Sequence, residues 1–325
     1  MTAVVVEDLC MTYRAPIRGS GWKETLSSVF NRRYREVPAV QNASFTLDAG
    51  EVVGFIGPNG AGKTTTMKIL SGLLHAGSGH VRVLGYSPWQ RRSDFLRRIA
   101  FIRGSQPVGG SQELTVLDTL RYQQLLYEVP TAEYRRNLDE LTGLLELEEL
   151  LQRQLRALSL GEKMRAGLAL SMLYRPEVLF LDEPTLGLDV SGAATMRRFV
   201  AEYAEQTGAT VLLTSHYMAD VASLCPRLVL IDKGKVQYDG QLDQLAARLS
   251  PYKLLRLTAP NADEERLRQA GEVIENSNGT WVLRVPREDV ARTTARLLTE
   301  LEVADLSVEE APLEVVIDRA YREGV

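Results

Sequence analysis

Short apolar runs that end at glycine or polar residues mark the first part of the chain. Val52–Ile56 is apolar, with β-branched and aromatic side chains, and a glycine-rich stretch follows it. Residues 178–181 and Thr210–Thr214 form similar runs, and each leads into polar residues. Runs of this length and composition are typical of buried strands in a parallel sheet. Residues 2–9 and the alternating stretch 39–47 predict two further strands.

A helical pattern precedes the run at residue 178. Residues 117–158 are rich in Leu, Glu, Arg and Gln with helical periodicity, and Pro130 is expected to interrupt this pattern. We interpret residues 115–175 as a helical region inserted between strands, with no catalytic site of its own. Because strands and helices alternate, and residues 80–86 predict one more strand, we expect an α/β fold.

Residues 251–325 carry a different pattern, without the spacing of a metal site or of nucleophilic catalysis. They predict a small α+β domain that follows a first domain of residues 1–250. Its strands are predicted at residues 254–257, 272–274, 281–285 and 305–309, with a hairpin across 276–279. Its helices are predicted at residues 263–270, at 290–301 and from Leu313. We expect a role in dimerisation or regulation, and inert packing is the alternative.

Residues 14–38 form a basic amphipathic insertion. Trp22, Leu26, Val29 and Phe30 recur at the spacing of one helical face, and arginine and lysine side chains surround them. Such a segment can lie at an anionic membrane surface. The alternative is that the apolar face packs on its own domain or on a partner subunit, while the basic groups stay in water.

Composition and charge limit the classes of function that this chain could have. Of the 325 residues, 45% are hydrophobic and 25% are charged, as in an ordinary globular protein. The net charge of −4 argues against a dedicated nucleic-acid binder. Cys10 and Cys225 have no close pairing motif, so we expect reduced, half-buried thiols. The chain shows no signal-peptide pattern and no run near the roughly 18–20 apolar residues that span a bilayer, so we expect a cytoplasmic protein. If it works at a membrane, another chain must supply the membrane spans.

The strongest chemical motif follows the run Val52–Ile56. A G-x-x-x-x-G-K-T sequence lies between this predicted strand and a helix that opens with Lys63. Glycines let backbone N–H groups turn toward phosphate oxygens, and the helix N-terminus and the lysine ammonium add positive charge. The Thr64 hydroxyl is suited to ligate Mg²⁺. The residues expected to bind the nucleotide are Gly57, Pro58, Asn59, Gly60, Ala61, Gly62, Lys63, Thr64 and Thr65.

Two carboxylates and a histidine follow the other buried runs. Asp182 and Glu183 come directly after residues 178–181, at the strand end where ligands of open α/β sheets bind. Asp182 suits Mg²⁺ coordination through a water, and Glu183 can orient and polarise an attacking water. His216 follows Thr210–Thr214 closely and is one of only three histidines. A surface acidic pair and a solvated loop histidine are the alternatives.

Three further places can touch a nucleotide. Gln106, in a glycine-rich loop, can reach Mg²⁺ or the attacking water, and Gln112 in the same loop is the fallback. Ser159 and Gly161 open a helix and can form an anion site, although Ser159 could be no more than an N-cap. Tyr13 can stack on an adenine ring, and a surface aromatic is the alternative.

Taken in order, these motifs resemble the ATP-binding subunit of ABC transporters over about residues 3–240. The resemblance implies a P-loop ABC cassette with a RecA-like core, an antiparallel β subdomain and a helical subdomain. It implies ATP and Mg²⁺ as cofactors, with Glu183 and His216 as catalytic residues. The motifs that match are the Walker A loop at 57–65, the glutamine loop at Gln106, the signature at 158–162, Walker B at 178–182, the D-loop Asp189 and the switch His216. The implied metal contacts are Thr64, Gln106 and Asp182.

In this family two cassettes pair head to tail, so that the signature of one chain completes the ATP site of the other. The implied partners are a second cassette, identical or paralogous, and separate transmembrane permease subunits. This chain has Leu160 and Glu162 where the family more often has Gly and Gln. The LSLGE signature, the insertion after Tyr13 and the sequence PYK at 251–253 are similar to a bacterial subfamily of exporter-type ATPases. The implied nucleotide contacts from this part of the chain are Ser159, Gly161, Glu162 and Asp189.

Three functions are compatible with a nucleotide-binding cassette. The first is the ATP-hydrolysing subunit of an ABC transporter, peripheral on the inner face of the cell membrane, with export implied by the resemblance. The second is a soluble ABC ATPase that acts on nucleic acid or ribosomes, which usually needs a coiled coil or two cassettes in one chain. The third is a non-hydrolysing subunit, against which Glu183 and His216 argue. The single cassette and the net acidic charge favour the first.

Overall fold

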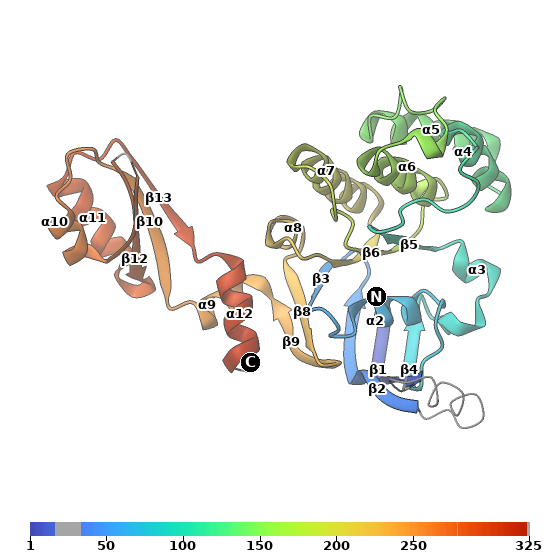
Figure 1. Ribbon diagram of the computed structural model, residues 1–325, viewed down its shortest axis with the longest axis horizontal. Coiled ribbons are helices and arrows are strands. Elements are labelled where there is room, and N and C mark those ends of the chain that lie inside the picture. The colour runs from blue at the N-terminus through green and yellow to red at the C-terminus, as the bar shows by residue number, and fades with distance from the viewer. Residues whose placement is uncertain (17–33, 278, 324–325) are drawn as a thin grey trace, which may run out of the picture. The chain divides into compact units, whose positions relative to one another are not determined.

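Two compact units make up the computed structural model, which describes residues 1–16, 34–277 and 279–323 (Figure 1). The first unit is Met1–Asp239 and the second is Gly240–Val325. Helix α9 (Leu242–Leu249) therefore groups with the second unit, whereas the sequence pattern starts the second domain after this helix, at residue 251.

A six-stranded sheet forms the centre of the first unit. Its order is β5-β6-β7-β3-β8-β9, and neighbouring strands from β5 to β8 run parallel. Every residue of β6 (Val178–Asp182) and β7 (Thr210–Thr214) is buried, as their apolar sequences predict. The other strands are β3 (Val52–Ile56), β5 (Ile99–Arg103), β8 (Arg227–Asp232) and β9 (Lys235–Gln241). Because β3, β6 and β7 are parallel, the motifs that follow them lie at one end of the sheet.

A three-stranded antiparallel sheet of order β2-β1-β4 accompanies it. Its strands are β1 (Thr2–Pro16), β2 (Tyr34–Asp48) and β4 (Ser78–Val83). The strands β1 and β2 are longer than the sequence predicts, because their ladder continues until Pro16 pairs with Tyr34. This ladder gives the backbone N–H and C=O groups partners on the opposite strand. Both ends of the basic insertion 14–38 are therefore strand, and the apolar side chains from Trp22 to Phe30 lie outside the described residues.

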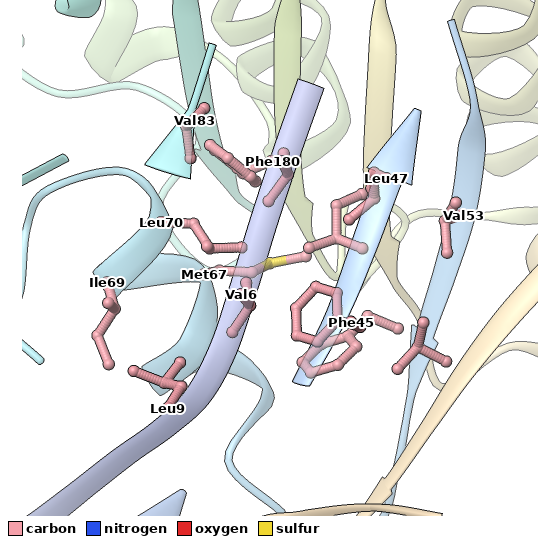
Figure 2. Close-up of a cluster of buried hydrophobic side chains, with 14 of the residues drawn as sticks. Val6, Leu9, Phe45, Leu47, Val53, Met67, Ile69, Leu70, Val83 and Phe180 are labelled. Atoms are coloured by element: carbon pink, nitrogen blue, oxygen red, sulfur yellow. The ribbon is translucent and has the colours of Figure 1, made fainter. Parts of the chain in front are cut away.

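A hydrophobic core joins the two sheets through helix α2 (Lys63–Leu70). Figure 2 shows Met67 and Leu70 of α2 among Val6 of β1, Leu47 of β2 and Phe180 of β6. All five side chains are almost completely removed from solvent. Helix α2 is thus packed firmly against both sheets through its second half.

Helices with defined boundaries connect the strands of the first unit. Pro130 separates α4 (Val116–Leu126) from α5 (Thr131–Leu144), as the sequence predicts. Thr115 and Asp118 form a capping box at the start of α4, and α7 (Val190–Thr207) ends at Gly208 with a φ of 67°. The remaining elements are α3 (Ser93–Leu96), α6 (Leu160–Met172), α8 (Met218–Leu224) and the 3-10 turns η1 (Pro88–Gln90) and η2 (Leu155–Ala157). Among the helices of the described residues, none has the length and apolar character to cross a membrane.

The second unit is built on a four-stranded antiparallel sheet of order β11-β12-β10-β13. Leu255 and Leu283 of the sheet share a core with Leu267 of α10 and Leu297 of α11. All the strands and helices predicted for residues 251–325 are present, and β11 and β12 extend further toward their hairpin than predicted. The elements are β10 (Tyr252–Thr258), α10 (Glu264–Ala270), β11 (Glu272–Ser277), β12 (Thr280–Pro286), η3 (Arg287–Asp289), α11 (Val290–Glu300), β13 (Asp305–Glu310) and α12 (Leu313–Glu323).

The two cysteines differ in their accessibility, which provides a test of the fold. Cys10 is partly exposed, whereas Cys225 is fully buried and not half-buried as expected. Burial raises the pKa of the Cys225 thiol to about 12, so the reactive thiolate is scarce at neutral pH. We expect the Cys10→Ser variant to react with a thiol reagent only after denaturation, measured by the absorbance of the released chromophore. Rapid labelling of this variant in its native state would contradict the burial of Cys225.

Candidate nucleotide site

The phosphate loop lies between β3 and α2, as the sequence predicts. Gly62, the residue before α2, has a φ of 107°, and a Cβ at this position would lie 2.3 Å from the carbonyl oxygen of Ala39. Only glycine fits this combination of left-handed backbone and close approach. Pro58, Asn59 and Gly60 are exposed, so the loop is open to a ligand.

Lys63 folds back over this loop. Its side chain is almost fully buried, and Nζ donates hydrogen bonds to the carbonyl oxygens of Gly57 at 2.6 Å and Pro58 at 3.1 Å. Burial lowers the pKa of Lys63, while the carboxylates of Glu183 and Asp182 act in the opposite direction. The ammonium group therefore lies close enough to interact electrostatically with both carboxylates at the end of β6.

Asp182 is held at the end of β6 by two hydroxyl groups. Side chains alternate along a strand, so Asp182 lies on the same face of β6 as Phe180, which belongs to the core around α2. Thr64 Oγ1, in the first turn of α2, donates to Asp182 Oδ2 at 2.9 Å. Thr214 Oγ1, opposite Asp182 in the parallel register of β6 and β7, donates to Oδ1 at 2.9 Å. The two predicted metal contacts Thr64 and Asp182 are thus adjacent.

Glu183 and His216 meet beyond the ends of β6 and β7. His216 Nε2 lies 2.7 Å from Glu183 Oε1. The backbone of Glu183 has a φ of 56°, which is uncommon for a residue with a side chain, and its N–H donates to both the carbonyl and the hydroxyl oxygen of Thr214 at 3.0 Å. Strained backbone of this kind is often found at functional sites. The carboxylate of Glu183 is 23% exposed and the ring of His216 38%, so a ligand can reach both.

Tyr13 lies beside the phosphate loop rather than on a distant surface. Its hydroxyl is 3.2 Å from Thr65 Oγ1, which joins β1 to the first turn of α2. The side chain is partly exposed, at 39%, so one part of the ring is free to meet a ligand. This position is compatible with the predicted stacking on adenine.

Ser159 is the N-cap of α6, as one of the two interpretations of the sequence expects. Its N–H donates to Glu162 Oε2 at 2.7 Å, and the N–H of Glu162 donates to Ser159 Oγ at 3.3 Å, which completes a capping box. Arg153 donates to Glu162 Oε1 at 2.6 Å. The hydrogen bond from the backbone of Ser159 and the neighbouring Arg153 hold the pKa of Glu162 below its usual range. Both oxygens of Glu162 are therefore engaged by its own chain.

A cavity of about 250 Å³ lies beside this helix start, and Ser159, Gly161, Glu162, Leu188 and Asp189 are among the residues that line it. Asp189 caps α7, since its Oδ1 accepts a hydrogen bond from the N–H of Gly192 at 2.7 Å. Apart from Gln106, the predicted nucleotide contacts among the described residues thus form two groups. One surrounds the phosphate loop, and the other surrounds this cavity.

The glutamine loop begins against Walker B. The N–H of Gly104 donates to the carbonyl oxygen of Asp182 at 2.8 Å, and Gln106 follows two residues later. Gln106 lines a cavity of about 740 Å³, whereas the carbonyl oxygen of Gln112 accepts a hydrogen bond from the N–H of Arg156 at 3.1 Å. The choice of Gln106 over Gln112 as the residue of the loop that serves the site stays a prediction.

Comparison with known proteins identifies the family. Residues 40–186 match the model of the family described as ABC transporter. The ABC transporter ATP-binding protein NatA of Bacillus subtilis is 30% identical over 216 residues, which cover 66% of this chain and 87% of that protein. The chain belongs to the ABC transporter family. The linearmycin resistance ATP-binding protein LnrL of Bacillus subtilis is 31% identical over 233 residues, which cover 72% of this chain and 74% of that protein.

Part of the second unit also matches a family model. Residues 251–309 fit the model of the EvrA-like ABC transporter C-terminal domain. A solved ATP-binding subunit of an ABC transporter shares the fold with a TM-score of 0.62 and 28% identity, covering 76% of this chain and 92% of that one. The predicted fold class, an ABC cassette followed by a small C-terminal domain, is confirmed. The predicted function as the ATP-hydrolysing subunit of an ABC transporter is confirmed at the level of the family.

Two residues of this ABC cassette were missed by the sequence analysis. Thr214 forms hydrogen bonds with both Asp182 and the backbone of Glu183. The sequence feature that could have indicated it is a hydroxyl residue at the end of a mostly apolar strand. Arg153 lies outside every sequence motif of the family. Only the folded chain brings it to Glu162.

The contact between the glutamine loop and Walker B can be tested with Gly104→Ala. A Cβ at Gly104 would lie 1.9 Å from the carbonyl oxygen of Glu183, so one of the two loops must move. Because a misplacement of about 1 Å can cost about a hundredfold in rate, we expect ATP turnover to fall by about ten- to a hundredfold. Gly109→Ala is the matched control, since a Cβ there meets nothing within 4 Å. An equal phosphate-release rate in both variants would contradict the prediction.

Proposed function

We propose that this ABC ATPase binds ATP and Mg²⁺ at its phosphate loop, hydrolyses ATP with Glu183 and His216, and powers export through separate membrane subunits. The observation that carries the proposal is the 2.7 Å contact between His216 Nε2 and Glu183 Oε1, next to the buried Asp182. A subunit that only bound nucleotide would have no need of this pair.

The side chains around Asp182 suit Mg²⁺. The hydroxyl of Thr64 and the carboxylate of Asp182 are hard oxygen ligands and already lie 2.9 Å apart. No cluster of three or more His, Cys, Asp or Glu residues within the described parts of the chain is arranged for a metal. This fits Mg²⁺, which is usually held by one or two carboxylates together with waters and substrate phosphates. We propose Thr64 and Asp182 as its protein contacts, with Gln106 as a third, and the ion would neutralise phosphate charge.

Phosphoryl transfer depends mainly on positioning and on charge stabilisation. The N–H groups of residues 57–65 and the ammonium of Lys63 would hold the phosphates, while Tyr13 stacks on adenine. The carboxylate of Glu183 would orient the attacking water and accept its proton. His216, within hydrogen-bond distance of Glu183, would keep that carboxylate aimed at the water.

A second cassette is the proposed partner at the signature. Leu160, Leu186, Val190 and Tyr217 are exposed large hydrophobic side chains on the segments of the signature, the D-loop and the switch histidine. Exposed apolar side chains of this kind mark interaction surfaces. A head-to-tail dimer would cover them and would bring Ser159, Gly161 and Asp189 to the ATP held by the other chain.

The cavity of about 740 Å³ is the proposed dock for a membrane subunit. Leu114, Tyr122 and Leu126 line it together with Gln106, and Tyr122 and Leu126 are more than half exposed. An amphipathic helix binds such a groove with its apolar face. A helix bound in this groove would then contact the glutamine loop, which is hydrogen-bonded to Asp182 through the N–H of Gly104. We propose a location on the inner face of the cell membrane for this reason, and residues 14–38 could add contacts to the lipid surface.

The proposed direction of transport is export. LnrL is named for linearmycin resistance, and its similarity to this chain supports a role in removing compounds from the cell. The alternative, a soluble ABC ATPase acting on nucleic acid or ribosomes, has less support. The net charge is −4, and the relatives described above are transporter subunits.

Glu183→Gln tests the proposed chemistry. The amide keeps the shape of the side chain but cannot accept a proton, so we expect turnover to fall by about 10²- to 10⁴-fold while ATP still binds. Phosphate release and the binding of a fluorescent ATP analogue are the two measurements. Glu133→Gln, an exposed position on α5, is the control and should change neither. Retained turnover in Glu183→Gln would remove Glu183 from the reaction.

Leu126→Glu tests the proposed dock. The charge would be placed on the lining of the groove, so we expect the membrane subunit to be lost when tagged protein is purified from detergent-solubilised membranes of the native cell. Leu298→Glu is the matched control, because Leu298 on α11 is 54% exposed and Leu126 is 56% exposed. The proposed dock is supported if a multi-span protein is recovered with Leu298→Glu and not with Leu126→Glu. Equal recovery with both variants would contradict it, and recovery of ribosomes or nucleic acid would favour the soluble alternative.

A further inference from the structure

A buried carboxylate lies behind the Glu183–His216 pair. Asp220, on helix α8, is 1% exposed and accepts hydrogen bonds from three side chains. Ser215 Oγ donates to Oδ2 at 2.7 Å, and Thr185 Oγ1 donates to the same oxygen. The guanidinium of Arg197, on α7, donates to Oδ1 at 2.8 Å. A charge this deeply buried is tolerated only when such partners compensate it, so the geometry around Asp220 is closely defined.

The first partner of Asp220 fixes the segment that carries His216. Ser215 immediately precedes His216, and its hydroxyl also accepts a hydrogen bond from the N–H of Tyr217 at 2.9 Å. The residues on both sides of His216 are thus held through one hydroxyl. That hydroxyl is in turn oriented by Asp220, because it donates its single hydrogen to the carboxylate and turns a lone pair to the N–H of Tyr217.

The second partner fixes the segment that carries Glu183. Thr185 lies two residues after Glu183, and its carbonyl oxygen accepts a hydrogen bond from the N–H of Leu188 at 3.1 Å. Since Thr185 and Ser215 donate to the same oxygen of Asp220, one atom joins the loop after β6 to the loop after β7. The guanidinium of Arg197 donates to the other oxygen of Asp220 and so keeps the carboxylate turned toward both loops.

We propose that Asp220 is a positioning residue for ATP hydrolysis, which keeps Glu183 and His216 within reach of each other by holding the two loops to one carboxylate oxygen. This inference rests on the roles assigned to Glu183 and His216 under the proposed function. Asp220 itself does not touch the reacting atoms. If the two loops separate, the Glu183–His216 contact is lost while the phosphate loop on α2 remains in place.

Asp220→Asn in the full-length protein is the first test. The amide keeps the volume but replaces one acceptor by a donor that faces either the hydroxyl groups or Arg197. We expect kcat to fall at least about tenfold, because small displacements of positioned groups are costly, while the affinity for ATP changes by less than about twofold. Asp243→Asn, an exposed position on α9, is the control and should leave both values unchanged.

Ser215→Ala is the second test, and it tests the positioning role of Asp220 even if Asp220→Asn does not fold. It removes the link between Asp220 and the His216 segment, and it should lower kcat in the same way with ATP affinity retained. Ser223→Ala is its matched control, since Ser223 Oγ donates only to the backbone oxygen of Asp220, at 3.1 Å. Hydrogen exchange should be faster at the amides of Tyr217 and Leu188 in Asp220→Asn, and at Tyr217 in Ser215→Ala.

Two outcomes would overturn the proposal. In the first, kcat of both variants matches that of their controls. In the second, ATP affinity and the melting temperature fall together with kcat and exchange rises throughout the chain, which would make Asp220 a residue of general stability only. The proposed function fails by a different result, namely turnover that survives Glu183→Gln. The exchange rates at Tyr217 and Leu188 would still report in that case whether Asp220 holds the two loops.

Discussion

The parallel register between β6 and β7 is the constraint on which the site depends. It sets Asp182 opposite Thr214, and from there the carboxylate reaches Thr64 at the start of α2. A slip of one residue would turn Asp182 to the other face of the sheet, because side chains alternate along a strand. All residues of both strands are removed from solvent, so a slipped register would leave the buried Asp182 without its two hydroxyl partners. Apolar packing therefore determines where the charged groups lie.

Much of the fold could be predicted from the sequence, because parallel strands buried on both faces need unbroken apolar runs. The residues that carry chemistry come directly after those runs, so their meeting at one end of the sheet followed from the order of the pattern. The second unit was predictable for a related reason, since strands and helices there alternate with clear turn residues. The extent of β1 and β2 was not, because their outer ends carry polar residues such as Arg14 and Glu36, and only the cross-strand ladder makes them strand.

Other features of the site arise from partners that are distant in the sequence. The interpretation of Ser159 as an N-cap was available from the sequence, but Arg153 as a partner of Glu162 was not. The same holds for Asp220, whose three donors come from different segments of the chain. A local sequence pattern predicts secondary structure and burial. It does not predict which donors bind a buried carboxylate, because these depend on how distant segments pack in the folded chain.

The pair of Arg153 and Glu162 gives the signature segment a charge balance of its own. A glutamate in the first turn of α6 adds negative charge at the place where a helix dipole favours an anion. The guanidinium of Arg153, 2.6 Å from Glu162 Oε1, offsets this charge, so that the pair carries no net charge. A glutamine at 162 alone would leave an unbalanced cation, and a neutral residue at 153 alone would leave an unbalanced anion. The charge at either position is therefore balanced only when the other residue is also present.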